Sequence, residues 1–314
     1  MKYWGKRDLV LNLPATGSIS VTLDRLATRT TVRFDPALAA DVFTLNGQEQ
    51  RRQGARVVRF LDLVRTTHGV TDHAHVETTN DFPTGAGLAS SASGFAALAL
   101  SCNEALGLGL TRPELSVLAR RGSGSAARSF IDGFAEMHVG TEADGSDAFA
   151  VQLAGADQVP LRMLVAVTTT AQKTVGSTEG MRLSEATSPF YGSWMDATTA
   201  DLSSMREAIL SADLARIGTL AESNCLRMHA VMLGCVPPLL YWNAATLEVM
   251  LAVRALRKEG RGAWFTIDAG PQVKVLCAAA EADAIEARLQ TLPGVHQVIS
   301  AAPGRGAHLC EEVQ

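Results

Sequence analysis

The residues best suited to chemistry lie in a loop of small side chains at residues 80–94, NDFPTGAGLASSASG. Without bulky side chains, the backbone N–H groups of such a loop can approach a phosphate, and a helix beginning behind it adds partial positive charge. Ser90, Ser91 and Ser93 bring hydroxyls that could bind phosphate oxygens or a magnesium ion. The other interpretation is a helix start that only packs closely against a sheet, and the loop alone favours neither.

A second loop of the same character occupies residues 122–129, GSGSAARS, and contains Arg128. An arginine can clamp a phosphate or a carboxylate through two parallel hydrogen bonds. Two candidate anion-binding loops in one chain are harder to explain by packing than one. A third small, polar segment, predicted as a loop, follows at residues 175–181.

Further candidate groups lie near both ends of the chain. Two of the five lysines, Lys2 and Lys6, fall within the first six residues, beside Tyr3 and Trp4. A frayed terminus is one interpretation, although aromatic side chains are unusual in a free tail. Asp268 lies between a hydrophobic strand and a Gly-Pro turn, where the local pattern favours a turn-capping aspartate over a positioned base.

The elements that must position these residues follow from hydrophobic periodicity and turn signals. Alternating residues predict strands at 18–23 and 28–34 in one antiparallel β region, and Asn-Gly at 46–47 predicts a hairpin turn. A boundary is expected near residue 160, giving domains 1–160 and 161–314. The other expected elements are helices at 51–65, 95–106, 112–121, 193–233, 241–259 and 282–292, and strands at 76–79, 163–169, 263–267, 273–276 and 296–300.

Bulk composition restricts the class of protein. With 314 residues and 47% hydrophobic content, the sequence is typical of a globular protein of one large or two ordinary domains. The net charge of −4 gives no reason to expect nucleic acid, so an anionic ligand would need a local basic pocket. No apolar run approaches the ~20 residues of a membrane helix, and five scattered cysteines suit a reducing compartment. We therefore expect a cytoplasmic protein with no membrane partner.

Taken together, these motifs resemble the diphosphomevalonate decarboxylases of the GHMP kinase superfamily. The most specific matches are the Lys-Tyr-Trp opening within residues 2–7 and the Asp-Ala-Gly-Pro turn at residues 268–271. The Gly/Ser loop is shared across the whole superfamily, and the resemblance extends to about residue 276. The remaining matching segments are residues 11–14, 82–92, 122–129, 177–181, 228–230 and 237–238.

The resemblance implies an α+β GHMP kinase fold, with an N-terminal domain like ribosomal protein S5 domain 2 and a ferredoxin-like C-terminal domain. The active site is then expected in the cleft between the two domains. The implied reaction is ATP-dependent decarboxylation of (R)-5-diphosphomevalonate to isopentenyl diphosphate in isoprenoid biosynthesis, with release of ADP, phosphate and CO2. The implied co-substrate is ATP with Mg2+, and homodimers are usual for the family.

The resemblance also implies roles for individual residues. Asp268 matches the catalytic base, Lys2 a cation that stabilises negative charge near the reacting hydroxyl, and Arg128 a further residue of the catalytic centre. Ser90 and Ser91 would hold the ATP phosphates and magnesium. The expected substrate contacts are Tyr3, Trp4, Gly5, Lys6, Arg56, Ser123, Gly124, Ser125, Ala126, Ala127, Arg128 and Thr178. The expected ATP contacts are Pro83, Gly85, Gly87, Leu88, Ala89, Ser90, Ser91 and Ala92.

Departures from the family pattern keep alternatives open. Family members have a further strand before the lysine motif, whereas Lys2 is the second residue here, so an inactive nucleotide-binding relative with a poorly fixed Lys2 is one alternative. Residues 15–18 read ATGS where the family commonly has an Asn-Ser-Ser run. A phosphomevalonate decarboxylase would need fewer cations than Lys6, Arg56 and Arg128 supply. A mevalonate 3-kinase-like enzyme typically lacks the pair of Asp268 and Lys2.

Overall fold

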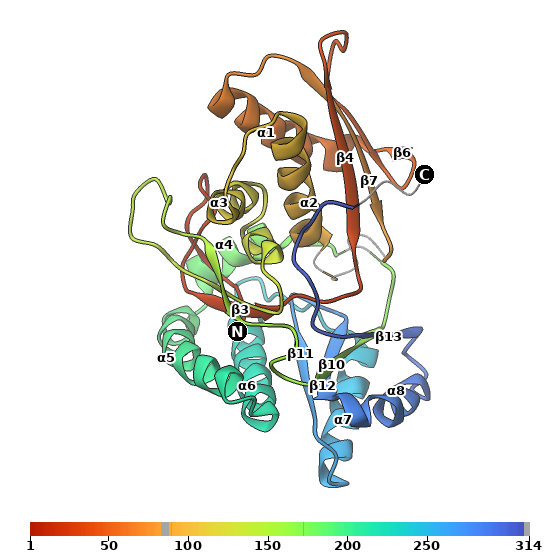
Figure 1. Ribbon diagram of the computed structural model, residues 1–314. Helices are drawn as coiled ribbons and strands as arrows, with labels where there is room; N and C mark the ends of the chain where they lie inside the picture. Colours follow the sequence, from red (N-terminus) through yellow and green to blue (C-terminus); the bar gives the residue numbers. More distant parts are fainter. Residues whose placement is uncertain (83–87, 89, 172, 311–314) are drawn as a thin grey trace.

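The chain is a mixed α+β protein, known from a computed structural model that describes residues 1–82, 88, 90–171 and 173–310. The described residues form four small sheets with helices packed against them. Figure 1 shows the N-terminal part above and the C-terminal part below, with the N-terminus near the junction between them. Within the described residues, no helix combines the length and the apolar character needed to cross a membrane.

The upper part is a four-stranded sheet covered by three helices. In order across the sheet, the strands are β4 (Thr28–Asp35), β7 (His73–Asn80), β5 (Val42–Leu45) and β6 (Gln48–Glu49). The helices are α1 (Arg51–His68), α2 (Ser90–Ala105) and α3 (Arg112–Gly122). The predicted hairpin is confirmed, because Asn46 and Gly47 join β5 to β6 with φ values of 51° and 75°, as a turn of this kind requires. The N-cap expected before α3 is also confirmed, since Thr111 and Glu114 form a capping box.

A three-stranded sheet and a short hairpin lie next to the N-terminus. The sheet is β3 (Ser18–Val21), β8 (Phe134–Met137) and β9 (Ala150–Ala154), the hairpin is β1 (Lys6–Asp8) with β2 (Leu13–Pro14), and a 3₁₀ helix, η1 (Gly124–Phe130), follows α3. The two strands expected within residues 18–34 are present and both pair antiparallel, but they belong to different sheets, because β3 pairs with β8 and β4 with β7. Ile19 packs in one apolar core, whereas Val32 and Phe34 pack in another, so the two strands separate.

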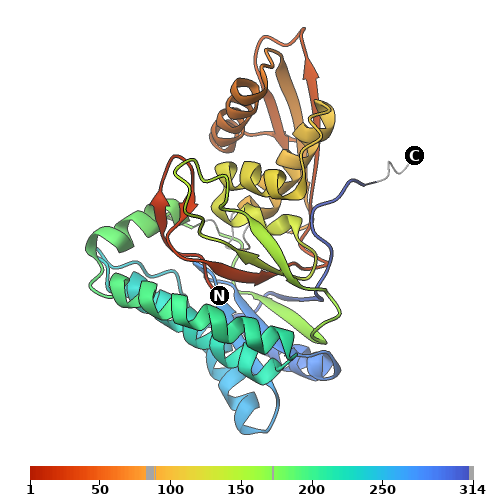
Figure 2. The ribbon, with the colours of Figure 1, turned by 60° about the vertical axis from the view of Figure 1, so that its left-hand side comes forward.

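The lower part is an antiparallel sheet with helices on both faces. Its strands, in order, are β11 (Ala263–Ile267), β12 (Val273–Ala278), β10 (Leu161–Val167) and β13 (Gln297–Ala301). The remaining helices are α4 (Ser177–Thr187), α5 (Tyr191–Leu210), α6 (Leu214–Leu233), α7 (Ala244–Lys258), α8 (Ala282–Gln290) and the 3₁₀ turn η2 (Ala279–Glu281). Figure 2 shows α5 and α6 side by side at the base of the molecule, where they pack on each other.

Strand β12 separates two apolar cores. Val273 and Val275 point into the core that α7 and α8 complete, whereas Leu276 packs in the core shared with β3 and α5. Because side chains alternate along a strand, Lys274 lies on the same face as Leu276 and points away from α7 and α8. A charged group is thereby placed on the side of the sheet that faces the upper part.

Two segments differ from simple expectation. Residues 175–181 are not a loop throughout, because α4 begins at Ser177 and places Thr178 in a helical first turn. After β13 the chain returns to the upper part, where the amide of Asp24 donates to the carbonyl of Ala302 at 2.9 Å. The last described residues therefore tie the two parts together.

Candidate active site

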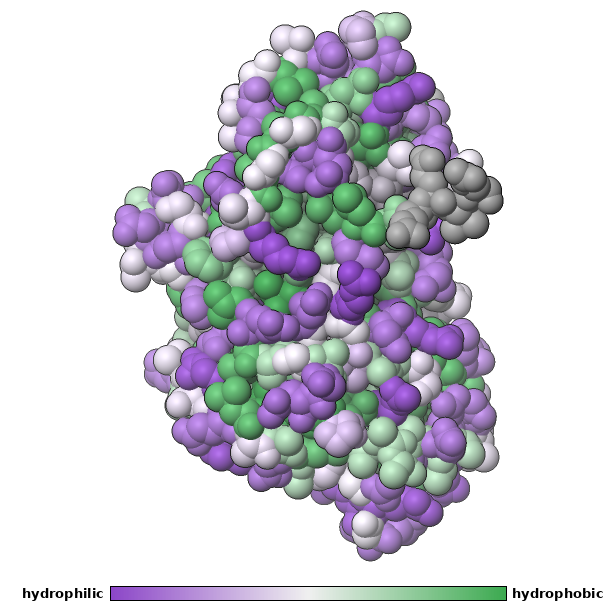
Figure 3. Space-filling model, viewed as in Figure 1, coloured by the Kyte–Doolittle hydropathy of each residue, from purple (hydrophilic) through white to green (hydrophobic). Residues whose placement is uncertain are grey.

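A cleft of about 2620 Å³ brings both anion-binding loops, the N-terminal segment and Asp268 together. Figure 3 shows strongly hydrophilic side chains along the middle of this face, where the upper and lower parts meet. The predicted site residues that line the cleft are Lys2, Tyr3, Trp4, Lys6, Arg56, Leu88, Ser90, Ser91, Ala92, Ser123, Gly124, Ser125, Arg128, Thr178 and Asp268. Gly5, Ala126 and Ala127 are buried beside these residues, and Pro83, Gly85, Gly87 and Ala89 lie outside the described residues.

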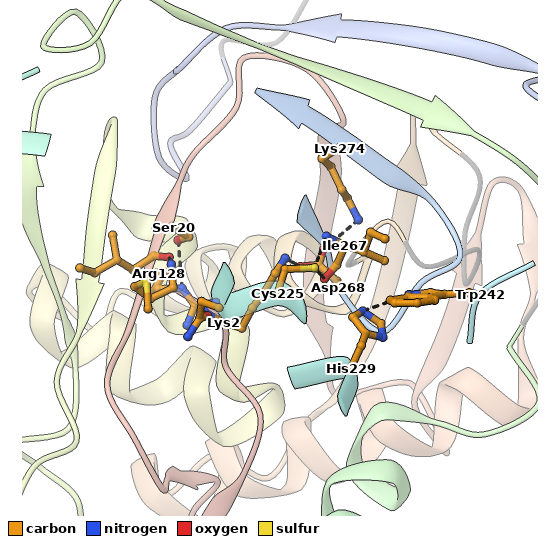
Figure 4. A network of polar contacts seen from close by, with 12 residues as sticks. Lys2, Ser20, Arg128, Cys225, His229, Trp242, Ile267, Asp268 and Lys274 are labelled. Atoms are coloured by element: carbon orange, nitrogen blue, oxygen red, sulfur yellow. Dashed lines mark hydrogen bonds and ion pairs between the residues drawn. The ribbon is translucent and has the colours of Figure 1, made fainter. Parts of the chain in front are cut away.

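Asp268 is held between two lysines at the end of β11. Lys2 Nζ lies 2.7 Å from Asp268 Oδ1, and Lys274 Nζ lies 2.8 Å from Oδ2 (Figure 4). Burial alone would raise the pKa of the Asp268 carboxyl, but the two ammonium charges and their hydrogen bonds outweigh burial and hold that pKa well below its ordinary value. The turn-capping role that the local pattern favoured is therefore replaced by a pair of ionic contacts facing the cleft.

Lys2 is fixed at both its backbone and its side chain. Its amide donates to Asn224 Oδ1 at 2.8 Å, and only 13% of its side chain is exposed. The next residues are anchored as well, because the Trp4 indole donates to Ser184 Oγ and the Trp194 indole donates to the Trp4 carbonyl, both at 3.0 Å. The interpretation of a frayed, poorly fixed N-terminus is therefore wrong.

Helix α6 supports the turn that carries Asp268. The Cys225 sulfur accepts from the Ile267 amide at 3.1 Å and contacts the Ile267 carbonyl at 3.4 Å. One turn further along, burial lowers the pKa of His229 to about 4, and the Trp242 indole donates to His229 Nε2 at 3.4 Å. The matched motif at residues 228–230 therefore belongs to the packing behind the site (Figure 4).

Arg128 is a partly buried cation in the same cleft. Its Nε donates to Ser20 Oγ at 2.9 Å and its Nη1 to Ser18 Oγ at 2.5 Å, and no carboxylate of the described residues forms an ion pair with it. Burial lowers the pKa of the guanidinium, and the nearby Tyr3 and Asp268 oppose that shift. A partly buried arginine that the described residues bind through neutral hydroxyls is suited to receive an anionic ligand.

Lys6 is a second buried cation. Its Nζ donates to Asn12 Oδ1 at 2.6 Å and to Thr178 Oγ1 at 3.2 Å, so α4 and the β1–β2 hairpin meet at this group. Burial, with a smaller contribution from the charge of Arg56, lowers the pKa of Lys6 to about 8. A carboxylate neighbour would have raised this pKa, so the lowered value reflects burial beside the neutral Asn12 and Thr178, with the positive charge of Arg56 nearby.

The two loops predicted to bind anions meet inside the cleft. Ser91, in the first turn of α2, lies 3.2 Å from Ser123 through their hydroxyl oxygens, and Ser123 lies 3.3 Å from Ser125. Gly124 is required by close packing, because a Cβ there would lie 2.3 Å from the Tyr3 hydroxyl. That hydroxyl is buried and has no hydrogen-bond partner among the described residues. A ligand oxygen could supply the missing partner.

Arg56 and Gly5 have local roles that the sequence pattern did not indicate. Arg56 is exposed on α1, as the pattern predicted, yet it turns to the cleft, donates to the Gly122 carbonyl at 3.2 Å and lies 4.9 Å from the centre of the Phe95 ring. Gly5 has a φ of 136°, and a Cβ there would lie 2.3 Å from the Tyr191 hydroxyl. Gly5 is therefore required by packing at the N-terminal segment.

Sequence reasoning missed several residues at the centre of the site. Lys274 and Lys173 both line the cleft, and Lys173 donates to Ser177 Oγ at 3.1 Å. Four of the five lysines of the chain line this cleft, and Lys258, at the end of α7, is the exception. A signal was available for Lys274, because this lysine interrupts an otherwise apolar strand. The hydroxyls of β3 that hold Arg128 share one face of their strand, as the alternation of side chains predicts.

Serine hydroxyls at a helix N-terminus, buried cations and a lysine-flanked aspartate share one cleft of an α+β protein. This combination is typical of a site that binds phosphorylated ligands and transfers a phosphoryl group.

Comparison with known proteins places the chain more narrowly. Residues 1–150 match the diphosphomevalonate decarboxylase-like N-terminal domain, and residues 163–308 match the mevalonate 5-diphosphate decarboxylase C-terminal domain. The diphosphomevalonate decarboxylase of Candida albicans is 35% identical over 290 residues, which cover 88% of this chain and 80% of that protein. The chain belongs to the diphosphomevalonate decarboxylase family.

Solved structures agree with this assignment. The crystal structure of mevalonate diphosphate decarboxylase from Staphylococcus aureus superposes with a TM-score of 0.93 at 40% identity, covering 99% of this chain and 94% of that one. A structure described as MDDEF in complex with MVAPP, AMPPCP and magnesium superposes with a TM-score of 0.91 at 45% identity, covering 97% and 93% of the two chains.

Proposed function

We propose that this protein catalyses the ATP-dependent decarboxylation of (R)-5-diphosphomevalonate to isopentenyl diphosphate, releasing ADP, phosphate and CO2. The observation that carries the proposal is the ion-paired Asp268, which faces the same cleft as the serine hydroxyls of α2 and Arg128. Arg128 forms no ion pair with a carboxylate of the described residues. The two ligands of the structure described as MDDEF, MVAPP and the nucleotide AMPPCP, correspond to the two kinds of anion that this cleft is built to hold.

Asp268 is proposed to act on the tertiary hydroxyl of the substrate. A tertiary hydroxyl is a weak nucleophile, so its attack on the γ-phosphorus of ATP needs a group that orients it and accepts its proton. Lys2 stabilises the negative charge that develops near the reacting oxygen. Loss of the new phosphate then leaves an electron-poor carbon, and the neighbouring carboxylate departs as CO2 with formation of the alkene.

The anionic ends of the substrate are proposed to bind the buried cations. Arg128 supplies a planar guanidinium for the diphosphate or the carboxylate, and the Tyr3 hydroxyl beside it lacks a partner in the described structure. Lys6 and Thr178 form a second contact point, with Arg56 at the cleft surface. The hydroxyls of Ser123 and Ser125 complete this half of the site.

The nucleotide is proposed to bind at the N-terminus of α2. Ser90, Ser91 and Ala92 form the first turn of this helix and line the cleft, where backbone N–H groups and hydroxyls favour phosphate. The described residues contain no cluster of three metal-binding side chains. The hydroxyls of Ser90 and Ser91 fit Mg2+, which usually keeps several waters and binds through substrate phosphates with few protein ligands. Ser90 and Ser91 would hold the ion, and its charge would neutralise the phosphates during transfer.

The other activities considered for this sequence are less well supported. An inactive relative was conceivable if Lys2 were loosely held, but both its amide and its ammonium group are fixed. Lys6, Arg56 and Arg128 all line the cleft, which is more positive charge than a monophosphate requires. Asp268 and Lys2, which a mevalonate 3-kinase-like enzyme typically lacks, are in contact.

One assay separates these activities. Purified protein is incubated with ATP, Mg2+ and either mevalonate, its 5-phosphate or its 5-diphosphate, and ADP and CO2 are followed together. We expect both products with the diphosphate. ADP formation without CO2 would instead identify a kinase, and CO2 from the monophosphate alone would identify the other decarboxylase.

The assembly and organisation of the protein are also proposals. A division into domains 1–160 and 161–314 is supported by the sheet of β10 to β13, whose strands all begin at or after residue 161. A homodimer is proposed from the habit of the family, and a cytoplasmic location from the scattered, reduced cysteines. Light scattering would measure the oligomeric state, and cell fractionation would measure the location.

Lys6 should make substrate binding depend on pH. Its pKa of about 8 means that the ammonium is charged below that pH and lost above it, so the KM for the diphosphate should rise as pH increases through about 8. Lys6→Met should raise KM roughly 10-fold at neutral pH and abolish the further rise. Initial rates between about pH 6 and about pH 10 test this expectation. Lys258→Met is the control, and an unchanged pH profile in Lys6→Met would assign the titration to another group.

A further inference from the structure

Lys274 is a charged residue at a position where the sheet requires none for stability. It lies in the middle of β12, opposite Val165 of β10 and Thr266 of β11, and only 11% of its side chain is exposed. Its neighbours along the strand, Val273 and Val275, are apolar and fully buried. An ion pair whose carboxylate side chain is 45% exposed contributes little to stability, so packing alone does not explain a lysine here.

One contact of Lys274 is with the proposed base. Its ammonium lies 2.8 Å from Asp268 Oδ2, while Lys2 occupies Oδ1 at 2.7 Å. Two ammonium groups on opposite oxygens fix the plane of a carboxylate and leave only its remaining lone pairs for a ligand hydroxyl. Lys2 belongs to the N-terminal segment, whereas Lys274 belongs to the interior of a four-stranded sheet (Figure 4). Lys274 is therefore the partner fixed by the rigid element.

We propose that Lys274 is a positioning residue for the reaction, which fixes the orientation of the Asp268 carboxylate and keeps it ionised. This inference rests on the proposed function. In the step concerned, the substrate O–H bond breaks and its proton passes to Asp268. The oxygen bonds to the γ-phosphorus of ATP, and ADP leaves with the electron pair of the broken P–O bond. A carboxylate flanked by two cations is a weak base, so it accepts the proton of the substrate hydroxyl late, as the new O–P bond forms.

Other charged and titratable groups also face Asp268, and they must remain in place in any test. They come from the N-terminal segment, η1, the segment after β10, and α6, and they are Met1 (amino group), Lys2, Arg128, Lys173, Cys225 and His229. Among these groups only Lys2 also contacts the carboxylate oxygens directly. Removing Lys274 therefore removes one of two direct cationic contacts and leaves the more distant charges unchanged.

The test compares Lys274→Met and Lys274→Arg in the CO2-release assay. Lys274→Met should lower kcat roughly 10- to 100-fold with KM for both ligands within about threefold, because the effect acts through the base. Loss of one cation should also raise the pKa of Asp268 and move the acid limb of the kcat–pH profile to higher pH. Lys274→Arg should restore most of kcat. Lys258→Met, an exposed lysine change on α7, is the matched control.

The possible outcomes remain distinguishable. Thermal melts identify a variant that does not fold, and Lys274→Gln, which keeps a polar side chain, then replaces Lys274→Met. A folded Lys274→Met or Lys274→Gln with kcat within twofold of the unmodified protein and an unmoved acid limb would overturn the inference. A rise in KM alone would also overturn it, by placing Lys274 in substrate binding. Absence of CO2 release by the unmodified protein would contradict the proposed function itself, and not only this inference.

Discussion

Asp268→Ala should lower kcat by about 10²–10⁴-fold and leave the affinity for ATP within about threefold. The Asp268 carboxylate faces the cleft, and each of its oxygens contacts the ammonium group of a lysine. Removing it deletes the proposed proton acceptor but leaves Lys2 and Lys274, so the site becomes more positive and both anionic ligands can still bind. Single-turnover rates and ATP titration by fluorescence measure the two quantities separately.

Asp268→Asn refines this prediction. The amide keeps the shape of the side chain but cannot accept a proton as a carboxylate does, so turnover should fall nearly as far as with alanine. Asp196→Ala, on the exposed surface of α5, serves as the control and should keep full activity. Retained turnover in both Asp268 variants would show that another group accepts the proton.

Arg128→Met should lower kcat/KM for the diphosphate roughly 30-fold or more, chiefly through KM. Arg128 is partly buried, held by two serine hydroxyls and without an ion-pair partner among the described residues, so a bound anion would supply its counter-charge. Arg128→Lys should recover only part of the loss, because an ammonium group cannot reproduce the planar two-point contact. Steady-state kinetics with each substrate varied in turn measures the effect.

The exposed Arg254 on α7 provides the matched control, since Arg254→Met removes the same charge at a residue that does not line the cleft. An Arg128→Met variant that weakened ATP binding and left the KM for the diphosphate unchanged would move Arg128 to the nucleotide half of the site.

Local sequence patterns predicted the helices, strands and turns of this protein better than the contacts within its active site. The hairpin at Asn46-Gly47 and the cap at Thr111 were readable because their causes lie within four residues. The ion pair of Lys2 with Asp268 joins residues 266 positions apart, and no periodicity records such a contact. For the same reason, local pattern favoured a capping role for Asp268, and only the resemblance of several motifs together indicated a base.

Other parts of the site depended on partners that a linear pattern does not show. Arg56 was correctly placed on an exposed helix face, but its turn toward the cleft depends on Phe95 and Gly122 from two other helices. The pairing of β3 with β8 brings Ser18 and Ser20 to Arg128, about 110 residues away, and strand alternation alone could not name that partner. Lys274 was also missed, although a lysine inside an apolar strand can be recognised from the sequence without the fold.

The concentration of lysines in the cleft has a practical consequence for handling this protein. Of the five lysines that could react with reagents that acylate primary amines, Lys258 lies at the exposed end of α7, and the other four line the cleft. Burial lowers the pKa of Lys6 to about 8, but Lys6 and Lys274 are buried and Lys2 and Lys173 are partly buried, so these four amines are poorly accessible to reagents. Dyes, crosslinkers or resins coupled through amines would therefore react first at the exposed Lys258, outside the cleft, whereas the exposed Cys310 lines the cleft and is a poor attachment point for thiol chemistry.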